Sequence, residues 1–401
     1  MGRLRYTTAG ESHGPGLTAI VEGVPAGLEV DEARIELFMR RRQRGYGAGG
    51  RMKIERDRAE IRSGVRHGLT TGAPIALWIE NRDFANWEKA MSAGPPEEGA
   101  DTKAFTKVVP GHADFAGALK YGHHDLRNVL ERASARETAA RAAVGAVALA
   151  FLERFGITIR SRVVSIGPER DERPEPGGPA ETGGVDWDKA EQSDVRTDDD
   201  ALAQRFRNRI DRAKKERTTV GGVVQTVAYG APVGLGSHIQ WDRKLDARIA
   251  QAMISINAAK GVAIGDGFAN TARWGREVQD VLEHAPRDPR RFRKTTNHAG
   301  GIEGGMSNGN PITVLVAIKA IATMTSPLPS VDINTGESVP AQYNRSDICQ
   351  VPRACPIAEA MLAITLADAM LEKLGGDSMS ETLRNHAGYV ASHQEFGTGA
   401  V

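Results

Sequence analysis

Three short stretches, far apart in the chain, place histidine or a carboxylate where proton transfer could occur. Residues 10–14 contain His13 and residues 110–114 contain His112, each beside glycine, and residues 345–347 place Asp347 near Arg345. Glycine allows the backbone to approach a ligand closely, and histidine changes its charge near neutral pH. If the fold gathers these stretches, they predict one site that binds an anion and transfers protons.

Arginine is concentrated on both sides of a glycine-rich loop at residues 45–50. Arg40, Arg41, Arg42 and Arg44 precede the loop, and Arg51 follows it. A helix dipole favours cations at the C-terminal end, so a solvated helix end explains the first four without a ligand. The same guanidinium groups also suit a small polyanion, through paired hydrogen bonds to carboxylate or phosphate. Both interpretations remain open from the residues alone.

A second set of donors begins an alanine-rich segment that predicts a helix over residues 131–155. Arg132, Ser134 and Arg136 stand at its start, and residues 142–152 are apolar on nearly every side. The free N–H groups at a helix N-terminus suit a phosphate. The apolar part predicts a helix that is buried between layers.

The other glycine and histidine clusters are weaker signals. Residues 265–267, 300–305 and 309 are rich in glycine, but they match neither a Walker A loop nor a dinucleotide-binding GxGxxG turn, so tight turns are the default interpretation. His123 and His124 are adjacent, which points them to opposite sides of a strand, and no third ligand is indicated. No metal site is therefore predicted.

The elements that must position these residues alternate irregularly, which favours an α+β fold in a single domain over residues 1–401. Helices are expected after a cap at Asp31 to about Gln43, at residues 201–215 as a solvated charged helix, and at residues 354–371 as a buried helix. A polar, Pro- and Gly-rich surface insertion is expected at residues 167–200, and a mobile tail from about residue 386. Strands are expected at residues 17–22, 51–55, 75–80, 162–166, 222–228 and 312–318.

Composition restricts the possible partners. The chain has 401 residues, 52 basic and 51 acidic, so its net charge of +1 predicts no general attraction to nucleic acid or to a membrane. The first residues lack the apolar core of a signal peptide, and the two cysteines, Cys349 and Cys355, lack CxxC spacing. A cytoplasmic protein with two packed thiols is expected.

Together the segments resemble the chorismate synthase family closely. The resemblance covers residues 7 to about 375 in family order, apart from the middle insertion. It implies a sandwich of antiparallel sheets around central helices, and a homotetramer. The implied reaction is the 1,4-anti-elimination of phosphate from 5-enolpyruvylshikimate 3-phosphate, which gives chorismate as the last step of the shikimate pathway. Reduced FMN is required without net redox change, and the reductant is either NADPH or an external flavin reductase. The matching residues are 8–14, 42–52, 110–114, 131–138, 255–261, 297–309 and 345–347.

The resemblance also assigns roles to particular positions. His13 would protonate the departing phosphate, His112 would protonate or stabilise the reduced flavin, and Asp347 would assist proton removal at the flavin N5. Arg42, Ala48, Arg51 and Arg136 occupy positions associated with the substrate or NADP. The implied FMN contacts are Arg132, Ala133, Ser134, Asn257, Ala258, Gly305, Lys319, Ala320, Ile321, Ala322, Thr323 and Arg345.

The chain departs from the family pattern at three of these places. Ala48 and Val109 stand where family members commonly have arginine, and Ala320 replaces a usual proline. Two missing cations would weaken substrate binding by a few kcal/mol, at about 1.5–3 kcal/mol per charged hydrogen bond. Nearby replacements in the sequence are Arg44, Lys107 and Lys53.

Two other classes of function compete with this reading. An FMN-dependent oxidoreductase would show net redox turnover, but the chain carries no nicotinamide-binding fingerprint. A nucleic-acid-binding protein would use residues 40–44 and 287–294, but the neutral total charge and the lack of interleaved aromatic residues oppose it.

Overall fold

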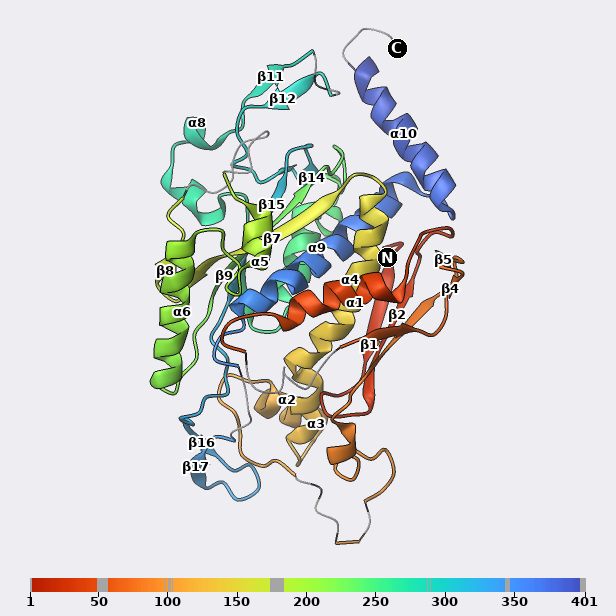
Figure 1. Cartoon of the computed structure of the whole chain (residues 1–401). Coiled ribbons are helices and arrows are strands. Elements are labelled where there is room, and N and C mark those ends of the chain that lie inside the picture. Colours follow the sequence, from red (N-terminus) through yellow and green to blue (C-terminus); the bar gives the residue numbers. More distant parts are fainter. Residues whose placement is uncertain are drawn as a thin grey trace.

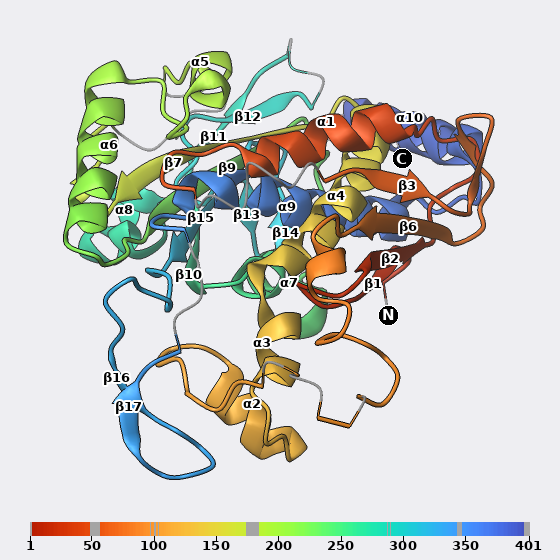
Figure 2. The same ribbon diagram turned by 60° about the horizontal axis from the view of Figure 1, so that its bottom comes forward.

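Two antiparallel sheets enclose a layer of helices, as Figures 1 and 2 show. The coordinates are a computed structural model of the chain. They describe residues 2–48, 57–96, 98–99, 102, 104–173, 184–286, 288, 290–342 and 347–396. The expected strand at residues 51–55 and the site candidates Arg51 and Arg345 lie outside the described residues.

The first sheet has the strand order β1-β2-β6-β3, and alternate residues of its strands face the helices. Its strands are β1 (Arg5–Ala9), β2 (Gly16–Glu22), β6 (Ile75–Glu80) and β3 (Ala59–Ile61). In β2, Leu17, Ala19 and Val21 are buried, and this period of two is typical of a strand with one covered face. The predictions at residues 17–22 and 75–80 are confirmed.

The second sheet has the strand order β10-β15-β9-β7-β8. Its central strand β9 pairs with β15 and β7, so Val224 lies between Val316 and Val163. The predictions at residues 162–166, 222–228 and 312–318 are confirmed, with β7 beginning four residues earlier. The strands are β10 (Ala259–Ile264), β15 (Ile312–Ile318), β9 (Gly222–Tyr229), β7 (Thr158–Ile166) and β8 (Glu169–Arg170).

The helices between the sheets are apolar on almost all sides. In α9 (Val351–Leu374) and α4 (Thr138–Glu153) nearly every residue is buried. Gly145 of α4 faces Ala360 of α9 so closely that a Cβ at Gly145 would lie 2.3 Å from the Ala360 Cβ. A third helix, α1 (Glu32–Gln43), packs on both, and the Asp31 side chain caps it by accepting a hydrogen bond from the Arg34 N–H. The sandwich and the buried helix at residues 354–371 are therefore confirmed.

Among the described residues, α9 is the one helix long and apolar enough to cross a membrane, judged by length and composition. The structure buries 89% of its most apolar window. Its place between the two sheets explains the apolar composition as that of a core helix.

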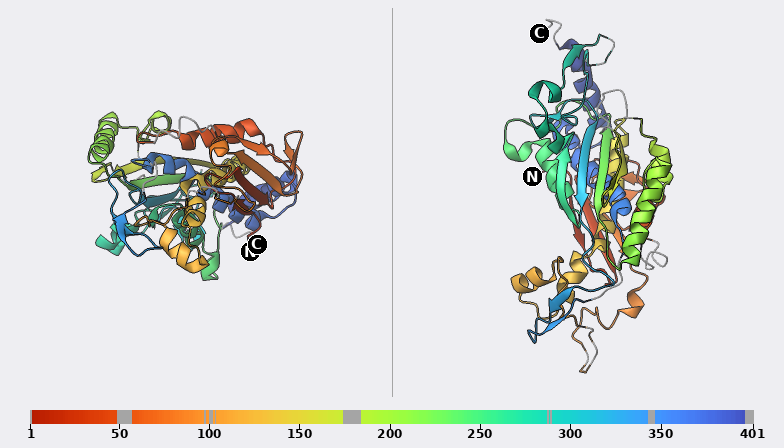
Figure 3. Two further views of the ribbon diagram at one scale, coloured as in Figure 1. Left: turned by 90° about the horizontal axis from the view of Figure 1, so that it is seen from below. Right: turned by 90° about the vertical axis from the view of Figure 1, so that its left-hand side faces the viewer.

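The remaining elements extend from this core at both ends and along one side, as Figure 3 shows. α2 and α3 lie at the end where the β16–β17 hairpin projects, and α10 and the β11–β12 hairpin lie at the other. The helices are α2 (Asp114–Tyr121), α3 (Arg127–Ala133), α5 (Trp187–Gln192), α6 (Asp200–Lys215), α7 (Leu245–Ile254), α8 (Gly275–Val278) and α10 (Met379–Glu395). The hairpins pair β4 (Val65–Arg66) with β5 (Leu69–Thr70), β11 (Leu282–His284) with β12 (Phe292–Lys294), β13 (Ile302–Glu303) with β14 (Met306–Ser307), and β16 (Pro329–Val331) with β17 (Ser338–Pro340). The short 3-10 helices are η2 (Phe84–Asn86), η3 (Ala135–Glu137), η4 (Trp241–Arg243) and η5 (Gly267–Ala272).

The prediction of one helix over residues 131–155 is wrong, because the helix is interrupted at Ser134. Ser134 has an extended backbone, and its hydroxyl accepts a hydrogen bond from the Arg136 N–H. A serine bonded in this way starts a new helical element. Arg132 therefore ends α3, whereas Arg136 lies in η3 before α4.

Two expectations of solvent exposure are also wrong in part. In α6, Leu202, Phe206 and Ile210 are buried, so the helix is amphipathic and only its charged face is solvated. Within the expected surface insertion at residues 167–200, Arg196 is buried and pairs with Glu191 and the carbonyl of Arg41. Ion pairing of this kind allows a polar segment to pack inside the protein.

At the C-terminal end, residues 386–395 continue α10, which begins with a capping box at Ser378 and Glu381. The expected tail is thus helical up to residue 395. Its mobility stays a prediction.

Candidate active site

His13 lies on a loop after β1 that other elements hold in place. The Asn81 amide donates to the carbonyls of Ser12 and Gly14, and the Ser12 N–H donates to the Glu131 carbonyl at 3.1 Å. A loop lacks the backbone hydrogen bonds of a sheet, and these bonds satisfy its polar groups instead. They also fix the backbone on both sides of His13.

The His13 imidazole is bound by a buried carboxylate. Nδ1 lies 2.9 and 2.8 Å from the two oxygens of Glu131, and the His13 N–H also donates to Oε2 at 2.9 Å. The Trp87 ring lies against the imidazole, with 4.1 Å between ring centroids. Arg127 donates to Glu131 Oε1 at 2.9 Å. The His13 side chain remains 23% exposed, whereas that of Glu131 is 4% exposed.

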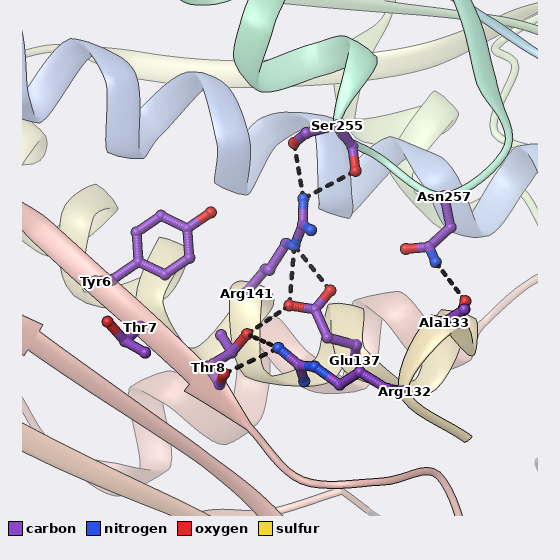
Figure 4. Close-up of a pocket in the computed structure, with 9 residues that line it drawn as sticks. All are labelled: Tyr6, Thr7, Thr8, Arg132, Ala133, Glu137, Arg141, Ser255 and Asn257. Carbon is purple, nitrogen blue, oxygen red and sulfur yellow. Dashed lines mark hydrogen bonds and ion pairs between the residues drawn. The ribbon is translucent and has the colours of Figure 1, made fainter. Parts of the chain in front are cut away.

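Next to this loop lies a cavity of about 590 Å³, shown in Figure 4. Arg141 crosses it, pairing with Glu137 and donating to Ser255, while Arg132 donates to the carbonyls of Thr8 and Gly10. The lining residues are Tyr6, Thr7, Thr8, Arg132, Ala133, Glu137, Arg141, Ser255 and Asn257. Cavities of this size typically hold small organic ligands.

A chain of contacts joins this cavity to His112. The Asn257 amide donates to the Ala133 carbonyl at 3.0 Å, and the next residue, Ala258, accepts from the Lys319 N–H at 2.9 Å. Lys319 Nζ in turn donates to the carbonyl of Gly111, which precedes His112. Ala258 has φ +66°, which lies in the left-handed region. This conformation is unfavourable for residues other than glycine, and strained residues of this kind cluster at functional sites.

The surroundings of His112 favour the neutral form of its imidazole. Burial lowers its pKa, Asp114 acts in the opposite direction, and Lys319 lowers the pKa further. Its buried Nδ1 has no hydrogen-bond partner among the described residues. An anion placed beside this nitrogen would favour its protonation.

Two of the expected substrate cations meet at a carboxylate that the sequence analysis did not select. Arg42 and Arg136 both pair with Asp57, Arg42 at 2.7 Å, and all three side chains are nearly fully buried. Burial acts to raise the Asp57 pKa, but the two guanidinium groups outweigh it and lower the pKa to about 2. Burial, opposed by Asp57, lowers the pKa of Arg42, and the neighbouring cations Arg353 and Arg136 lower it further. The cluster therefore holds more positive than negative charge.

A smaller cavity of about 30 Å³ lies beside this cluster, and Asn257 lines both cavities. Asp347 faces it and forms an ion pair with Arg353, whose Nε also donates to the Arg42 carbonyl at 3.2 Å. The Arg353 side chain packs against Gly45, at the start of the loop that contains Ala48. Arg353 is thus a cation beside the start of this loop.

Ser134 connects the histidine side of the site to the arginine side. Its hydroxyl donates to Ser12 Oγ at 3.2 Å and accepts from the Arg136 N–H. His13, the larger cavity and the Arg42–Asp57–Arg136 cluster therefore form one continuous region.

Most expected site residues within the described part of the chain lie in this region, but Gly305 does not. Its carbonyl accepts from the Leu245 N–H at the start of α7, whereas Asn257 follows the other end of that helix. A ten-residue helix is about 15 Å long, so the two residues are well separated within one chain. Residues 319–323 follow β15 near Gly111, where the Ala322 Cβ is 3.9 Å from a Cβ built on Gly111.

The remaining glycine cluster has a packing role. A Cβ on Gly300 would lie 2.2 Å from the Gly265 backbone nitrogen, so these loops approach backbone to backbone. Their interpretation as tight turns is supported.

Three residues that pair with expected site residues were not selected from the sequence: Asp57, Glu131 and Arg353. Asp57 follows a segment of mixed basic and acidic residues. Glu131 lies inside one of the motifs that match the family, but the resemblance assigned it no role. Arg353 lies in the first turn of α9, six residues after Asp347. Asp57 and Glu131 are paired with residues of other elements, and the Arg353–Asp347 pair joins a helix to the loop before it, so no regular spacing in the sequence indicates these pairs. A search of the described residues for three or more clustered His, Cys, Asp or Glu finds no candidate metal site.

The sandwich, the ligand-sized cavity and the cationic cluster beside His13 define an enzyme that acts on a small-molecule substrate. Comparison with known proteins gives the family: the model of the chorismate synthase family matches residues 4–371. The chain belongs to the chorismate synthase family. It is 52% identical to a chorismate synthase from Symbiobacterium thermophilum, over 96% of this chain and 98% of that protein.

Other relatives agree with this assignment over nearly the whole length. A chorismate synthase from Aquifex aeolicus is 51% identical, with 98% of this chain and 99% of that protein covered. A crystal structure of chorismate synthase superposes with a TM-score of 0.77 at 43% identity, and covers 98% of this chain and 99% of the other.

Proposed function

We propose that the protein catalyses the 1,4-anti-elimination of phosphate from 5-enolpyruvylshikimate 3-phosphate, a carbon–oxygen lyase reaction that yields chorismate as the last step of the shikimate pathway. The observation that carries the proposal is the continuous region in which His13 meets the Arg42–Asp57–Arg136 cluster through Ser134. The substrate has one phosphate and two carboxylates, and clustered negative charge of this kind needs buried cations.

The residues fit reduced FMN as the cofactor. The cavity of about 590 Å³ is large enough for a flavin nucleotide, and the buried Asn257 Oδ1 has no partner among the described residues, so it can accept a ligand N–H. When bound in this cavity, reduced FMN would provide the electron that assists the breaking of the carbon–oxygen bond, without net redox change. The residues that would hold it are Arg132, Ala133, Ser134, Asn257, Ala258, residues 319–323 and Arg345, whereas Gly305 lies apart from them within one chain.

Three residues handle protons in this proposal. His13 donates a proton to the departing phosphate, and His112 holds a proton beside the cofactor. Asp347, oriented by Arg353, is the carboxylate that accepts a proton. Arg42, Arg51, Arg136 and the loop around Ala48 contact the substrate or NADP, and Arg353 offsets the missing arginine at position 48.

The proposal extends to the setting of the reaction. The enzyme is a cytoplasmic homotetramer whose flavin is reduced by NADPH or by a separate flavin reductase. Nucleic acid and membrane have no part in it.

The test is phosphate release from 5-enolpyruvylshikimate 3-phosphate under anaerobic conditions with photoreduced FMN. We expect one phosphate and one chorismate per substrate, with the flavin absorbance unchanged at the end. A parallel aerobic assay with NADPH and oxidised FMN shows whether the protein reduces its own flavin. Activity in both assays indicates an intrinsic reductase, whereas activity only in the first indicates an external one.

The control is the same anaerobic mixture with oxidised FMN and no reductant, which should be silent. Flavin oxidation in proportion to product would instead support the FMN-dependent oxidoreductase. Absence of phosphate release from folded protein that binds FMN would contradict the proposal.

A further inference from the structure

Arg141 of α4 lines the larger cavity, and most of its side chain is buried. Its Nε donates to Glu137 Oε2 at 2.8 Å, and its Nη1 donates to Ser255 Oγ at 2.8 Å and to the Ser255 carbonyl at 3.1 Å. Figure 4 shows both sets of contacts. The remaining nitrogen, Nη2, has no hydrogen-bond partner among the described residues, and the Arg141 side chain is 17% exposed.

The contacts around Glu137 hold the Arg141 guanidinium in one orientation. Glu137 Oε1 also accepts from Thr8 Oγ1 at 2.8 Å, and the Glu137 side chain is only 9% exposed. A guanidinium that is held at two of its three nitrogens has little conformational freedom left to lose when it binds a ligand. The third nitrogen, which carries two N–H groups, is therefore preorganised as a donor.

The second arginine of this cavity, Arg132, is committed to the backbone. Its Nη1 donates to the Gly10 carbonyl, and its Nη2 donates to the carbonyl and the hydroxyl of Thr8. Among the described residues that line the cavity, the two arginines outnumber the one carboxylate, that of Glu137. An excess of positive charge in a cavity favours an anionic ligand, and Arg141 carries a terminal nitrogen that these residues do not use.

We propose that Arg141 binds the anionic part of the flavin cofactor through Nη2. This inference rests on the proposed function, which places FMN in this cavity. Two groups of the cofactor can carry such a charge: the terminal phosphate of FMN and the ring of the reduced flavin. A guanidinium donates charge-assisted hydrogen bonds to either group, and the choice of flavin in the binding experiment separates the two.

Oxidised riboflavin is the reference ligand, because it has the ring and the sugar alcohol without either charge. In Arg141→Gln we expect the Kd of the charged form to rise by about 10–100-fold, while that of oxidised riboflavin changes by less than about 3-fold, since this is the contribution of a hydrogen bond to a charged group. A rise for oxidised FMN assigns the contact to the phosphate. A rise only for the reduced forms of both flavins, measured anaerobically, assigns it to the ring. Equal changes for all the flavin forms, or no change, would overturn the inference.

Arg141→Lys separates the contact from the stability of the fold. Lysine keeps a positive charge beside Glu137, but its ammonium lacks the planar fork that bonds to Glu137, Ser255 and a ligand at once. The charged flavin form should therefore bind more weakly than in the wild type and more tightly than in Arg141→Gln.

The matched control is Arg34→Gln, which removes a partly exposed arginine that pairs with Glu153 at the other end of α4. Its Kd for every flavin form should equal that of the wild type. A loss of affinity for the charged form like that of Arg141→Gln would contradict the proposal.

These titrations need neither substrate nor turnover. If the wild-type protein released no phosphate from 5-enolpyruvylshikimate 3-phosphate, the proposed function would fail, while flavin binding would still report on Arg141. Wild-type protein that bound neither FMN nor riboflavin would overturn the inference.

Discussion

At the scale of single residues, charged side chains are buried together in a group whose positive and negative charges do not cancel. Asp57 receives both Arg42 and Arg136, and each of the three side chains is almost fully enclosed. A buried pair of this kind is costly to break, because removing one partner leaves the other charge unpaired. Breaking the cluster should therefore destabilise the fold, and its excess positive charge suits an anionic ligand.

The low pKa of Asp57 predicts a specific dependence of stability on pH. Its pKa is about 2 in the folded protein against an ordinary value of 3.8, so folding favours the ionised form. This stabilisation is complete above the unfolded pKa and is lost as the pH falls through the folded pKa, at roughly 2 kcal/mol in total. The free energy of unfolding should therefore drop between about pH 4 and pH 2.

Comparison with Asp57→Asn isolates this contribution. At pH 6 we expect the variant to unfold at lower urea, with a loss of about 3 kcal/mol, since two guanidinium groups lose their counter-charge. The difference between the variant and the wild type should shrink as the pH falls from 4 to 2. A difference that is independent of pH would show that Asp57 does not carry the effect.

At the scale of elements, the site depends on how helices and loops are held against one another. Arg41, next to Arg42 in α1, bonds to Glu359 of α9 and Glu191 of α5, and the Tyr46 N–H bonds to the Asp194 carbonyl. The middle segment thus holds the end of α1 and the loop that contains Ala48. This contact gives the part of the expected insertion around residues 187–198 a structural role.

The crossing of α4 and α9 predicts opposite effects for one substitution at two glycines. Gly145→Ala would place a Cβ 2.3 Å from the Ala360 Cβ, so the two central helices must separate, at a cost of about 1–3 kcal/mol. Gly388→Ala in α10 meets no atom of the described residues within 4 Å and should stabilise by about 0.5–1 kcal/mol, as alanine does in a helix. Urea unfolding of both variants gives the comparison, and equal shifts would contradict the close packing of α4 on α9.

At the scale of the whole molecule, several large apolar side chains between residues 239 and 282 are exposed. Trp241 is 78% exposed, Phe268 81% and Trp274 70%, and Ile239, Val281 and Leu282 lie in the same stretch of chain. Large exposed apolar side chains of this kind mark contacts between proteins. They support the proposed homotetramer.

Light scattering tests the assembly directly. We expect a mass of about four chains of 43.1 kDa, and a smaller species when Phe268 and Trp274 are both changed to serine. Serine at two exposed positions should leave the fold of the chain intact, which circular dichroism can check, while removing apolar contact area. A wild-type mass of one chain would contradict the proposal.

The sequence by itself predicted the elements whose signal is local. The strands at residues 75–80 and 312–318, the helix capped by Asp31 and the buried helix near residues 354–371 follow from period, capping and apolar composition. Buried cysteines were also predicted, and burial raises the pKa of Cys349 and of Cys355 to about 12. Resemblance to a family then supplied the fold, and it supplied the candidate site residues, whose roles stay predictions.

Only the tertiary structure decided how those residues act together. Ser134 interrupts the expected long helix, because its hydroxyl accepts a hydrogen bond from the Arg136 N–H. Arg196 can be buried because it donates hydrogen bonds to Glu191 and to the Arg41 carbonyl. Asp57, Glu131 and Arg353 became visible through partners 15, 118 and 6 residues away. The physical reason is that local patterns encode propensity and burial, whereas charge pairing and ligand geometry depend on contacts that exist only once the chain has folded.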